Sequence, residues 1–298
     1  MIEVSSRVKG FVLDSCQVVN TSGRRTTGLE TREGVTDVRV VRCAFVGQSA
    51  AIKINKDPKG VLIESCTFED WTQRAIQVLG SAGLAASDIR IAQSSIGPNV
   101  GRASVRQPIQ FNGVSASPFR RVSIVDNSLT GRATAHADPR SPGTADMISL
   151  HECHDFEILR NTCTNGGEVG ITVARQCRDG VIADNTITSC DSAGIAVGSG
   201  TTQEVRGIEV RGNVLMNNGL DRMRAGRPGW ARAGVVVYRA TSVSVKDNTI
   251  KNHGAVHAQD YGVTVTDSDE VTVVNNTTSG LAKSPVLRRS RKQGEKSI

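Results

Sequence analysis

The sequence is poor in aromatic residues, which make up 3% of its 298 residues, and only 38% of the chain is apolar. It contains 30 glycines, and no segment shows a helical spacing of apolar residues. Few aromatic side chains and many glycines favour short strands joined by small-residue turns over a helical protein. No run of about 18 apolar residues occurs, so we expect no membrane span.

Zinc-binding and secretory signals are also missing. The seven cysteines form no paired C-x-x-C motif, so we predict no structural zinc site. The first five residues, Met-Ile-Glu-Val-Ser, lack the charged-then-apolar build of a secretory signal. Without a zinc motif, the cysteines are explained by the fold, as small buried residues.

Positive charge is concentrated at one end of the chain. The 36 Lys and Arg exceed the 29 Asp and Glu by 7, and residues 283–298 alone hold six basic residues against one acidic residue. The rest of the chain is therefore near +7 − 5 = +2. We expect residues 283–298 to be a basic, disordered tail and residues 1–282 to form one domain. Because the basic balance belongs to the tail, nucleic acid is not an expected partner.

A short motif of alternating apolar residues recurs ten times, at spacings of 23 to 35 residues. Each copy ends in a small or amide side chain, namely Cys16, Cys43, Cys66, Ser94, Asn127, Asn161, Asn185, Asn213, Asn248 and Asn276. Every copy but the last is followed by a second strand such as Gly170-Ile-Thr-Val or Gly194-Ile-Ala-Val.

A unit this small cannot bury its own apolar face, so it must stack on its neighbours. Stacking predicts an all-β solenoid of about ten coils, with the Asn side chains forming a hydrogen-bonded column at one turn. Cys16, Cys43 and Cys66 occupy the same column in the first coils, and Cys153 and Cys177 are expected to stack at another turn.

This pattern resembles the right-handed parallel β-helix family, the pectate-lyase-like superfamily, over residues 8–282. The resemblance rests on the repeated N-x-[TI]-I and G-I-x-V motifs. It implies a single-stranded right-handed solenoid with three parallel sheets per coil and an Asn ladder between the second and third. It further implies that the Gly-Ile-x-Val strands form the first sheet, the face on which family members bind polysaccharide. An extracellular or cell-surface location is expected from the same likeness.

The candidate site follows from the outward positions of that first sheet. They are mostly polar up to the sixth coil and become small or apolar beyond it, and long connections at 97–107, 130–145, 216–232 and 251–260 flank them. Amide, hydroxyl and charged groups at rung spacing suit the hydroxyls and carboxylates of an acidic polysaccharide. An ordinary solvated sheet face is the alternative. The predicted substrate-binding residues are Gln77, Gln110, Asn112, Ser149, Thr172, Arg175, His136, Asp138, Trp230, Tyr238 and Arg239.

His151 is the best single catalytic candidate. It should point outward at the end of a strand that begins near Asp146, and Arg140 lies in the preceding loop. A histidine near a carboxylate and an arginine can serve as general acid or base, while Arg can neutralise a uronate carboxylate. We name His151, Asp146, Arg140 and Lys53 as catalytic candidates. An inert surface histidine is the plain alternative.

Metal ions are weaker hypotheses. His151, Cys153 and His154 are too close together at a strand end for one tetrahedral ion. Calcium held by Asp138, Asp146 and Asp155 has no loop signature to support it, so no cofactor is predicted.

The segment Asp146-Met-Ile-Ser-Leu-His-Glu152 is similar to the Tyr-Gly-Phe-Asp-Pro-His-Glu motif of mannuronan C-5 epimerases. His151 and Glu152 match that motif, whereas Asp146 replaces the Tyr and Ser149 replaces the Asp. The likeness implies lyase or epimerase chemistry on a uronate polymer, and the absence of paired Asp signatures argues against pectin hydrolysis. A non-catalytic glycan-binding rod, of an adhesin or phage-tail type, and a spacer module of a larger chain remain the competing hypotheses.

Overall fold

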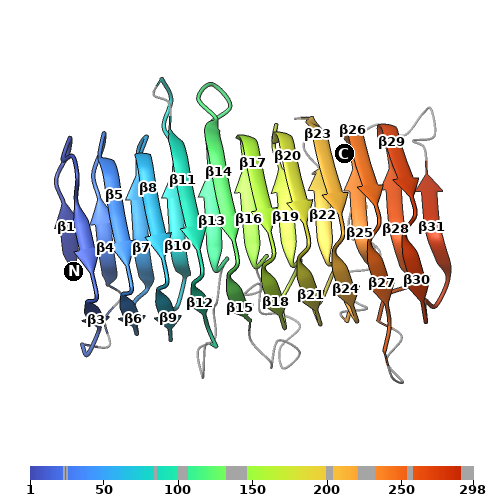
Figure 1. Cartoon of the computed structure of the whole chain (residues 1–298), viewed down its shortest axis with the longest axis horizontal. Coiled ribbons are helices and arrows are strands. Elements are labelled where there is room, and N and C mark those ends of the chain that lie inside the picture. The colour runs from blue at the N-terminus through green and yellow to red at the C-terminus, as the bar shows by residue number, and fades with distance from the viewer. Residues whose placement is uncertain are drawn as a thin grey trace.

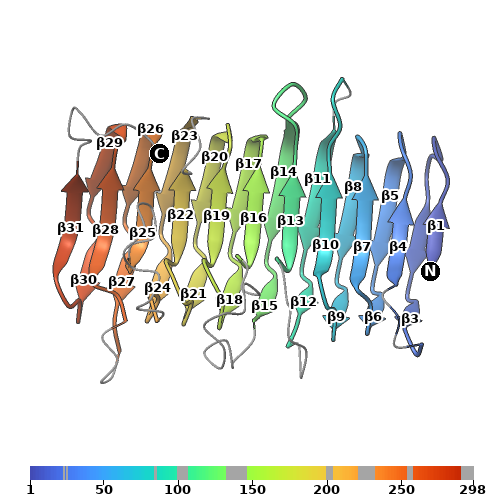
Figure 2. The ribbon, with the colours of Figure 1, turned by 180° about the vertical axis from the view of Figure 1, so that it is seen from behind.

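The computed structural model describes residues 1–22, 24, 26–83, 86–98, 107–131, 146–198, 204–220, 232–253 and 258–289. Within these residues the chain forms strands and no helix, and it winds as a rod through three parallel sheets (Figures 1 and 2). No described segment is a helix long and apolar enough to cross a membrane.

The first sheet contains the Gly-Ile-x-Val strands and has 11 members. They are β1 (Ile2–Val4), β4 (Thr27–Thr31), β7 (Ala50–Asn55), β10 (Arg74–Leu79), β13 (Ile109–Asn112), β16 (Ile148–His151), β19 (Ile171–Ala174), β22 (Ile195–Gly198), β25 (Ala233–Tyr238), β28 (Tyr261–Thr266) and β31 (Ser284–Arg289).

The second sheet is built from the alternating apolar motif and has ten strands. They are β2 (Val12–Asp14), β5 (Thr36–Val41), β8 (Lys59–Glu64), β11 (Ser87–Ala92), β14 (Phe119–Val125), β17 (Cys153–Leu159), β20 (Arg178–Ala183), β23 (Val205–Arg211), β26 (Ala240–Lys246) and β29 (Asp269–Val274).

The third sheet also has ten strands, most of only three residues. They are β3 (Gln17–Val19), β6 (Ala44–Val46), β9 (Thr67–Glu69), β12 (Ser95–Ile96), β15 (Ser128–Thr130), β18 (Thr162–Thr164), β21 (Thr186–Thr188), β24 (Val214–Met216), β27 (Thr249–Lys251) and β30 (Thr277–Ser279).

Each strand pairs in parallel with the strand three positions further along the chain, as in the register Ile148 to Ile171 between β16 and β19. The three-sheet solenoid of about ten coils is therefore confirmed. The predicted end of the domain at residue 282 is not where the sheet stops, because β31 pairs with β28 through Val263 to Val286. Residues 284–289 extend the first sheet, and residues 290–298 lie outside the described part of the chain.

The turn between the second and third sheets carries the predicted asparagine ladder. Asn185 donates from Nδ2 to Asn213 Oδ1 at 2.9 Å and to the Ile158 carbonyl at 2.9 Å, and its own Oδ1 accepts the Asn161 backbone N–H at 2.9 Å. These side chains are buried, so their hydrogen bonds replace those that water would otherwise provide. The same geometry repeats from Asn127 to Asn276 and fixes the turn in these six coils.

The seven cysteines are all free thiols, and six of them are buried. Cys43 and Cys66 occupy the ladder column before its asparagines begin. Cys153 forms no disulfide, and its backbone N–H lies 3.4 Å from the Cys177 Sγ in the next coil. The predicted stacking of Cys153 on Cys177 is confirmed, and burial raises the pKa of the Cys153 thiol well above its ordinary value.

Candidate functional site

The candidate site lies on the outer face of the first sheet, where β10, β13, β16 and β19 run side by side (Figure 1). One outward column is formed in register by Gln77, Gln110, Ser149 and Thr172. The neighbouring column places Asn112 beside His151. The sequence alternation predicted both columns, because side chains in a strand point alternately to the two faces.

The middle of the first column is covered rather than open. Ser149 has an exposed fraction of 0% and Gln110 one of 7%. Ser149 stands between Gln110 and Thr172 in the column, and its hydroxyl is buried. We expected an open wall of polar groups here, and the structure corrects that expectation for these two residues. Gln77 donates to the Gln110 side chain at 3.0 Å, which ties the column together.

His151 ends β16 and is half-buried. Its Nδ1 lies 3.4 Å from the Asn112 Oδ1, and in the tautomer that donates Nδ1–H to this amide oxygen Nε2 keeps its lone pair. Burial, and next the positive charge of Arg175, lower the His151 pKa to about 4. The imidazole is therefore neutral near pH 7 and can accept a proton.

Asp146 precedes β16 at the opposite end of the same strand. Burial raises the pKa of its carboxyl to about 6, although the Thr172 hydroxyl, the Val169 backbone N–H and the Ser149 hydroxyl partly counteract that rise. Neither hydroxyl oxygen makes a hydrogen bond of good geometry within the protein. The carboxyl and the two hydroxyls thus form a polar group with hydrogen-bonding capacity to spare.

Asp146 and His151 do not form a compact pair. Five residues of largely extended chain separate them, up to roughly 16 Å, and no contact joins them in the described structure. They define two sub-regions of one strand face, and the predicted acid–base couple is not assembled from these two residues alone.

Glu152 follows His151 at the corner between the first and second sheets, and sequence reasoning left it out of the candidate site. Its side chain is 5% exposed, and its Oε2 has no hydrogen-bond partner. Burial raises the Glu152 pKa, and the charge of Arg175 opposes that shift. Arg175 itself is exposed at the same corner, one coil further on. The matching Glu in the epimerase motif was the available signal for this residue.

Lys53 is not part of this group. It lies three rungs away from Ser149 in the same column, roughly 14 Å at about 4.8 Å per rung, and its Nζ pairs with Glu30 at 2.9 Å. Asn55 donates to the same Glu30 carboxylate at 2.8 Å. Lys53 is therefore not a catalytic candidate, because Glu30 neutralises its charge and it is distant from Ser149.

Tyr238 and Arg239 lie further along the rod. Tyr238 is buried on the outer face within a small apolar cluster that includes Val169, Ala233 and Val236, so it does not line an open surface as predicted. The Arg239 guanidinium stacks over the Tyr238 ring at 5.1 Å from its centroid.

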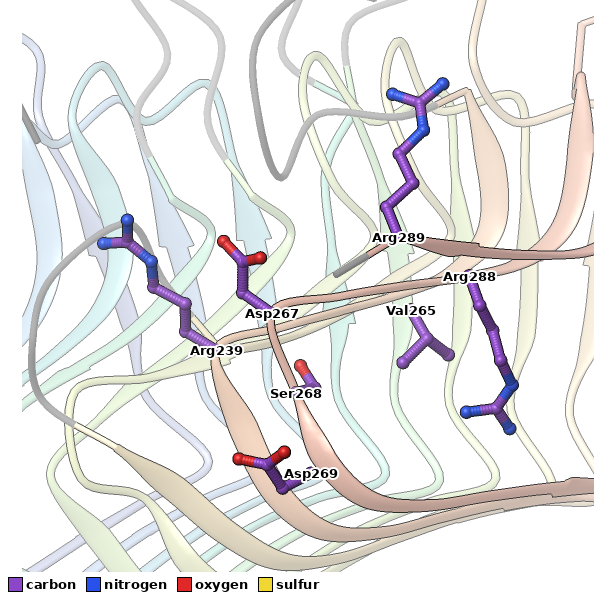
Figure 3. Close-up of a pocket in the computed structure, with 7 residues that line it drawn as sticks. All are labelled: Arg239, Val265, Asp267, Ser268, Asp269, Arg288 and Arg289. Carbon is purple, nitrogen blue, oxygen red and sulfur yellow. The ribbon is translucent and has the colours of Figure 1, made fainter. Parts of the chain in front are cut away.

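Beyond Arg239 a pocket of about 480 Å³ opens at the corner of the last coils. Figure 3 draws Asp267 between Arg239 and Arg289, and the pocket is also lined by Val265, Ser268, Asp269 and Arg288. Charges of both signs therefore meet here. The strand β25 that leads to Arg239 is three rungs from β16, so this pocket is separate from His151.

Four predicted site residues, Arg140, His136, Asp138 and Trp230, lie outside the described residues. The metal hypotheses find no support among the described residues, which contain no group of three or more potential ligands. Asp155 is on β17 in the second sheet, 3.8 Å from Arg120, while Asp146 borders the first sheet. Cys153 points into the core between His151 and His154, so those three side chains do not converge.

The chain belongs to the right-handed β-helix family, whose model, described as "Right handed beta helix region", matches residues 27–202 and 107–278. Among solved structures, the A-module of the Azotobacter vinelandii mannuronan C-5 epimerase AlgE6 is similar, with a TM-score of 0.54 and 11% identity over 97% of this chain and 83% of that chain. PfbA, a surface adhesin of Streptococcus pneumoniae, has a TM-score of 0.53 and 12% identity over 95% and 83% of the two chains. No curated protein sequence matches the chain. At these identities the likenesses establish the fold, which an epimerase and an adhesin share.

Proposed function

We propose that the protein acts on an acidic polysaccharide by removing the proton next to a uronate carboxylate, with His151 as the base. The observation that carries this proposal is the position of His151, half-buried at the end of a polar column with the exposed cation Arg175 at the same corner one coil further on. Burial and Arg175 lower the pKa of the imidazole to about 4, so it is neutral near pH 7. Arg175 would receive the uronate carboxylate, and Gln77, Asn112 and Thr172 offer hydrogen bonds to sugar hydroxyls.

The reaction begins when Nε2 takes the C5 proton and the two electrons of the C5–H bond move toward the carboxylate. The Arg175 charge stabilises the electron density that develops there. The imidazolium that forms is a strong acid in this site, because burial and Arg175 disfavour its charge. In cleavage, the electron pair returns to form the C4=C5 double bond, the C4–O bond breaks, and the imidazolium protonates the departing oxygen. In epimerisation, the electron pair returns to C5 and takes a proton from water on the opposite face, and the imidazolium loses its proton to solvent. Both outcomes share the first step.

Deuterium exchange tests that first step directly. Homopolymers of mannuronate, galacturonate and glucuronate would be incubated with the protein in deuterium oxide, and the polymer examined by proton NMR and by ultraviolet absorbance of the unsaturated uronate. We expect deuterium at C5 or an unsaturated product with at least one polymer. His151→Gln should reduce the rate by about 100-fold or more, as expected for loss of a general base.

Arg175→Gln should reduce the rate as well, whereas His253→Ala, on an exposed turn away from the first sheet, should leave it unchanged. Absence of both exchange and cleavage with all three polymers would reject the proposal.

Glycan binding without turnover is the second candidate function. The separation of His151 from Asp146 favours it, since the described residues supply no second acid–base group in contact with the imidazole. Under this alternative the polymer binds, neither exchange nor cleavage occurs, and His151→Gln leaves the affinity nearly unchanged.

A further inference from the structure

A second surface, on the second sheet, carries a row of basic side chains that the candidate site does not use. Arg120, His154, Arg178 and Arg206 follow one another in register on β14, β17, β20 and β23. These four strands lie side by side in Figure 1. We call these four residues the cationic row. It begins just around the corner from the candidate site, because only two residues separate His151 from His154.

Several other arginines on this sheet or at its edge are neutralised by acids. Arg121 makes two hydrogen bonds to Asp88, at 2.6 and 2.8 Å. Arg160 pairs with Asp126 at 2.7 Å in the same two-pronged way. Arg211 lies 3.3 Å from Glu209. Such pairs balance the surface charge, and the pairs of Arg121 with Asp88 and of Arg160 with Asp126 also join successive coils.

The cationic row differs because its charges lack such partners. Arg120 has one long ion pair, 3.8 Å to Asp155, and no ion pair within the described residues involves Arg178 or Arg206. The Arg178 Nε is buried and without a hydrogen-bond acceptor. Leaving a charged donor unpaired costs free energy. The positive potential also acts on His154, whose pKa is lowered by burial and then by Arg178 and Arg120.

We propose that the cationic row binds a linear acidic polysaccharide lying along the rod axis, separately from the chain bound on the first sheet. Successive side chains are about 4.8 Å apart, so a polymer with regularly repeated carboxylates or sulfates can meet more than one of them. Arginine presents a planar set of donors that matches a carboxylate with two hydrogen bonds.

A sugar polymer fits this row better than a nucleic acid. Asp155 and Asp179 follow His154 and Arg178 directly in the chain and lie beside the row, where they can accept hydrogen bonds from sugar hydroxyls. The row holds no Phe, Tyr or Trp on which bases could stack, and its one ring is the half-buried imidazole of His154. The sugar nature of the ligand rests on the proposed function, whereas its negative charge follows from the row alone.

The test measures polymer binding in a protein that cannot turn the polymer over. In a His151→Gln background, the affinity for polygalacturonate and for heparin would be measured by isothermal titration calorimetry at several salt concentrations. Arg206→Gln removes an exposed member of the row, and Arg178→Gln with Arg206→Gln removes two. The matched control is Arg160→Gln with Arg211→Gln, which removes the same charge from the same sheet but from neutralised pairs. Thermal unfolding checks that each variant is folded.

We expect the double row variant to bind at least one of the two polymers about five- to tenfold more weakly, since each exposed ion pair contributes a factor of a few. Its affinity should also depend less steeply on salt, while the control variant behaves like the parent. Arg206→Gln alone should show a smaller loss of polymer affinity. That result tests the proposal if the double variant fails to fold.

Equal affinities for the row variants and the parent would overturn the proposal, as would displacement of both polysaccharides by single-stranded oligothymidylate at matched charge. The outcome is separate from that of the proposed function. Row binding can persist when no polymer is turned over, and turnover can be found while the row variants bind as the parent does.

Discussion

His151 and Asp146 stand at the two ends of one strand face, and burial moves their pKa values in opposite directions. Above about pH 6.5 His151 is neutral in both the folded and the unfolded chain. As the pH falls from 6.5 toward about 4, the unfolded chain takes up a proton that the folded His151 does not, so its burial destabilises the fold increasingly. The burial of Asp146 acts oppositely. It destabilises the fold above about pH 6, where the buried carboxyl is ionised, and this cost in folding free energy vanishes as the pH falls below the ordinary carboxyl pKa of 3.8.

This difference gives a prediction for His151 that needs no substrate. We expect its ring proton in an NMR titration to change shift with a midpoint near pH 4, assigned by its loss in His151→Gln. Arg175→Gln should move the midpoint upward, because it removes a positive charge that disfavours the imidazolium. In urea unfolding, His151→Gln should lose less stability than the parent between pH 6.5 and 4. A midpoint at or above 6.5 would contradict the burial of this imidazole.

At the scale of single residues, the sequence predicts the direction in which a side chain points better than it predicts what surrounds that side chain. Strand alternation places Ser149 and His151 on the outer face, and the structure agrees. Alternation says nothing of what covers a short side chain, so it did not predict the burial of Ser149. The pairing of Lys53 with Glu30 depends on which coils are adjacent and on side-chain reach, so a list of outward residues could not separate Lys53 from His151.

At the scale of strands, one pair in the second sheet shows how the coils share their core volume. Phe156 of β17 lies in register with Gly180 of β20, at a position that other coils fill with Val122, Ile208 or Val243. A Cβ atom built on Gly180 would overlap the Phe156 ring. The glycine therefore makes room for the Phe156 ring. The two residues act as a unit, because a large side chain in one coil faces a glycine, which has no side chain, in the next.

Gly180→Val should therefore destabilise the protein by about 2–3 kcal/mol through overpacking, and Phe156→Val should also destabilise it by leaving a cavity. The double variant Phe156→Val with Gly180→Val restores the usual residue in both coils. It should be more stable than the sum of the single effects predicts, by at least about 1 kcal/mol. Urea unfolding of the four proteins measures this coupling. Strictly additive effects would show that the ring and the glycine do not share the same space.

The strands themselves could be predicted wherever the repeat is intact. The last strand of the first sheet was missed because β31 reads Ser-Pro-Val-Leu-Arg-Arg and lacks the Gly-Ile-x-Val pattern. Its Arg288 takes the inward position that Val265 holds one coil earlier, and its guanidinium donates to the Val271 carbonyl at 3.0 Å. A charge at an inward position breaks the alternation on which the prediction rested. Only the backbone pairing with β28 reveals that the coil continues.

At the scale of the whole molecule, each described strand pairs with strands of the coil before and the coil after its own. The element order within every sheet follows the order along the chain, so no strand returns to a distant coil. In such a rod the stability is close to a sum of coil terms and nearest-neighbour terms. The candidate site on β13, β16 and β19 should therefore tolerate the loss of a coil that does not touch it.

Deleting residues 36–58 tests this consequence. Thr36 and Lys59 occupy equivalent positions in successive coils, so the deletion removes one full turn and places Lys59 where Thr36 stood. Val18 would then face Phe68 in place of Phe45, and the strand alternation is preserved. We expect a folded protein with the same type of circular dichroism spectrum, lower stability, and polymer affinity within about twofold of the parent.

The shorter deletion of residues 36–46 is the control, and it should be the more damaging of the two. It removes β5 and β6 but keeps β7, so the chain would have to leave the first sheet and re-enter it without passing through the other two. No register of stacked coils accommodates that path, and we expect aggregation or loss of cooperative unfolding. If the shorter deletion were tolerated as well as the full turn, the coil would not be the unit of stability.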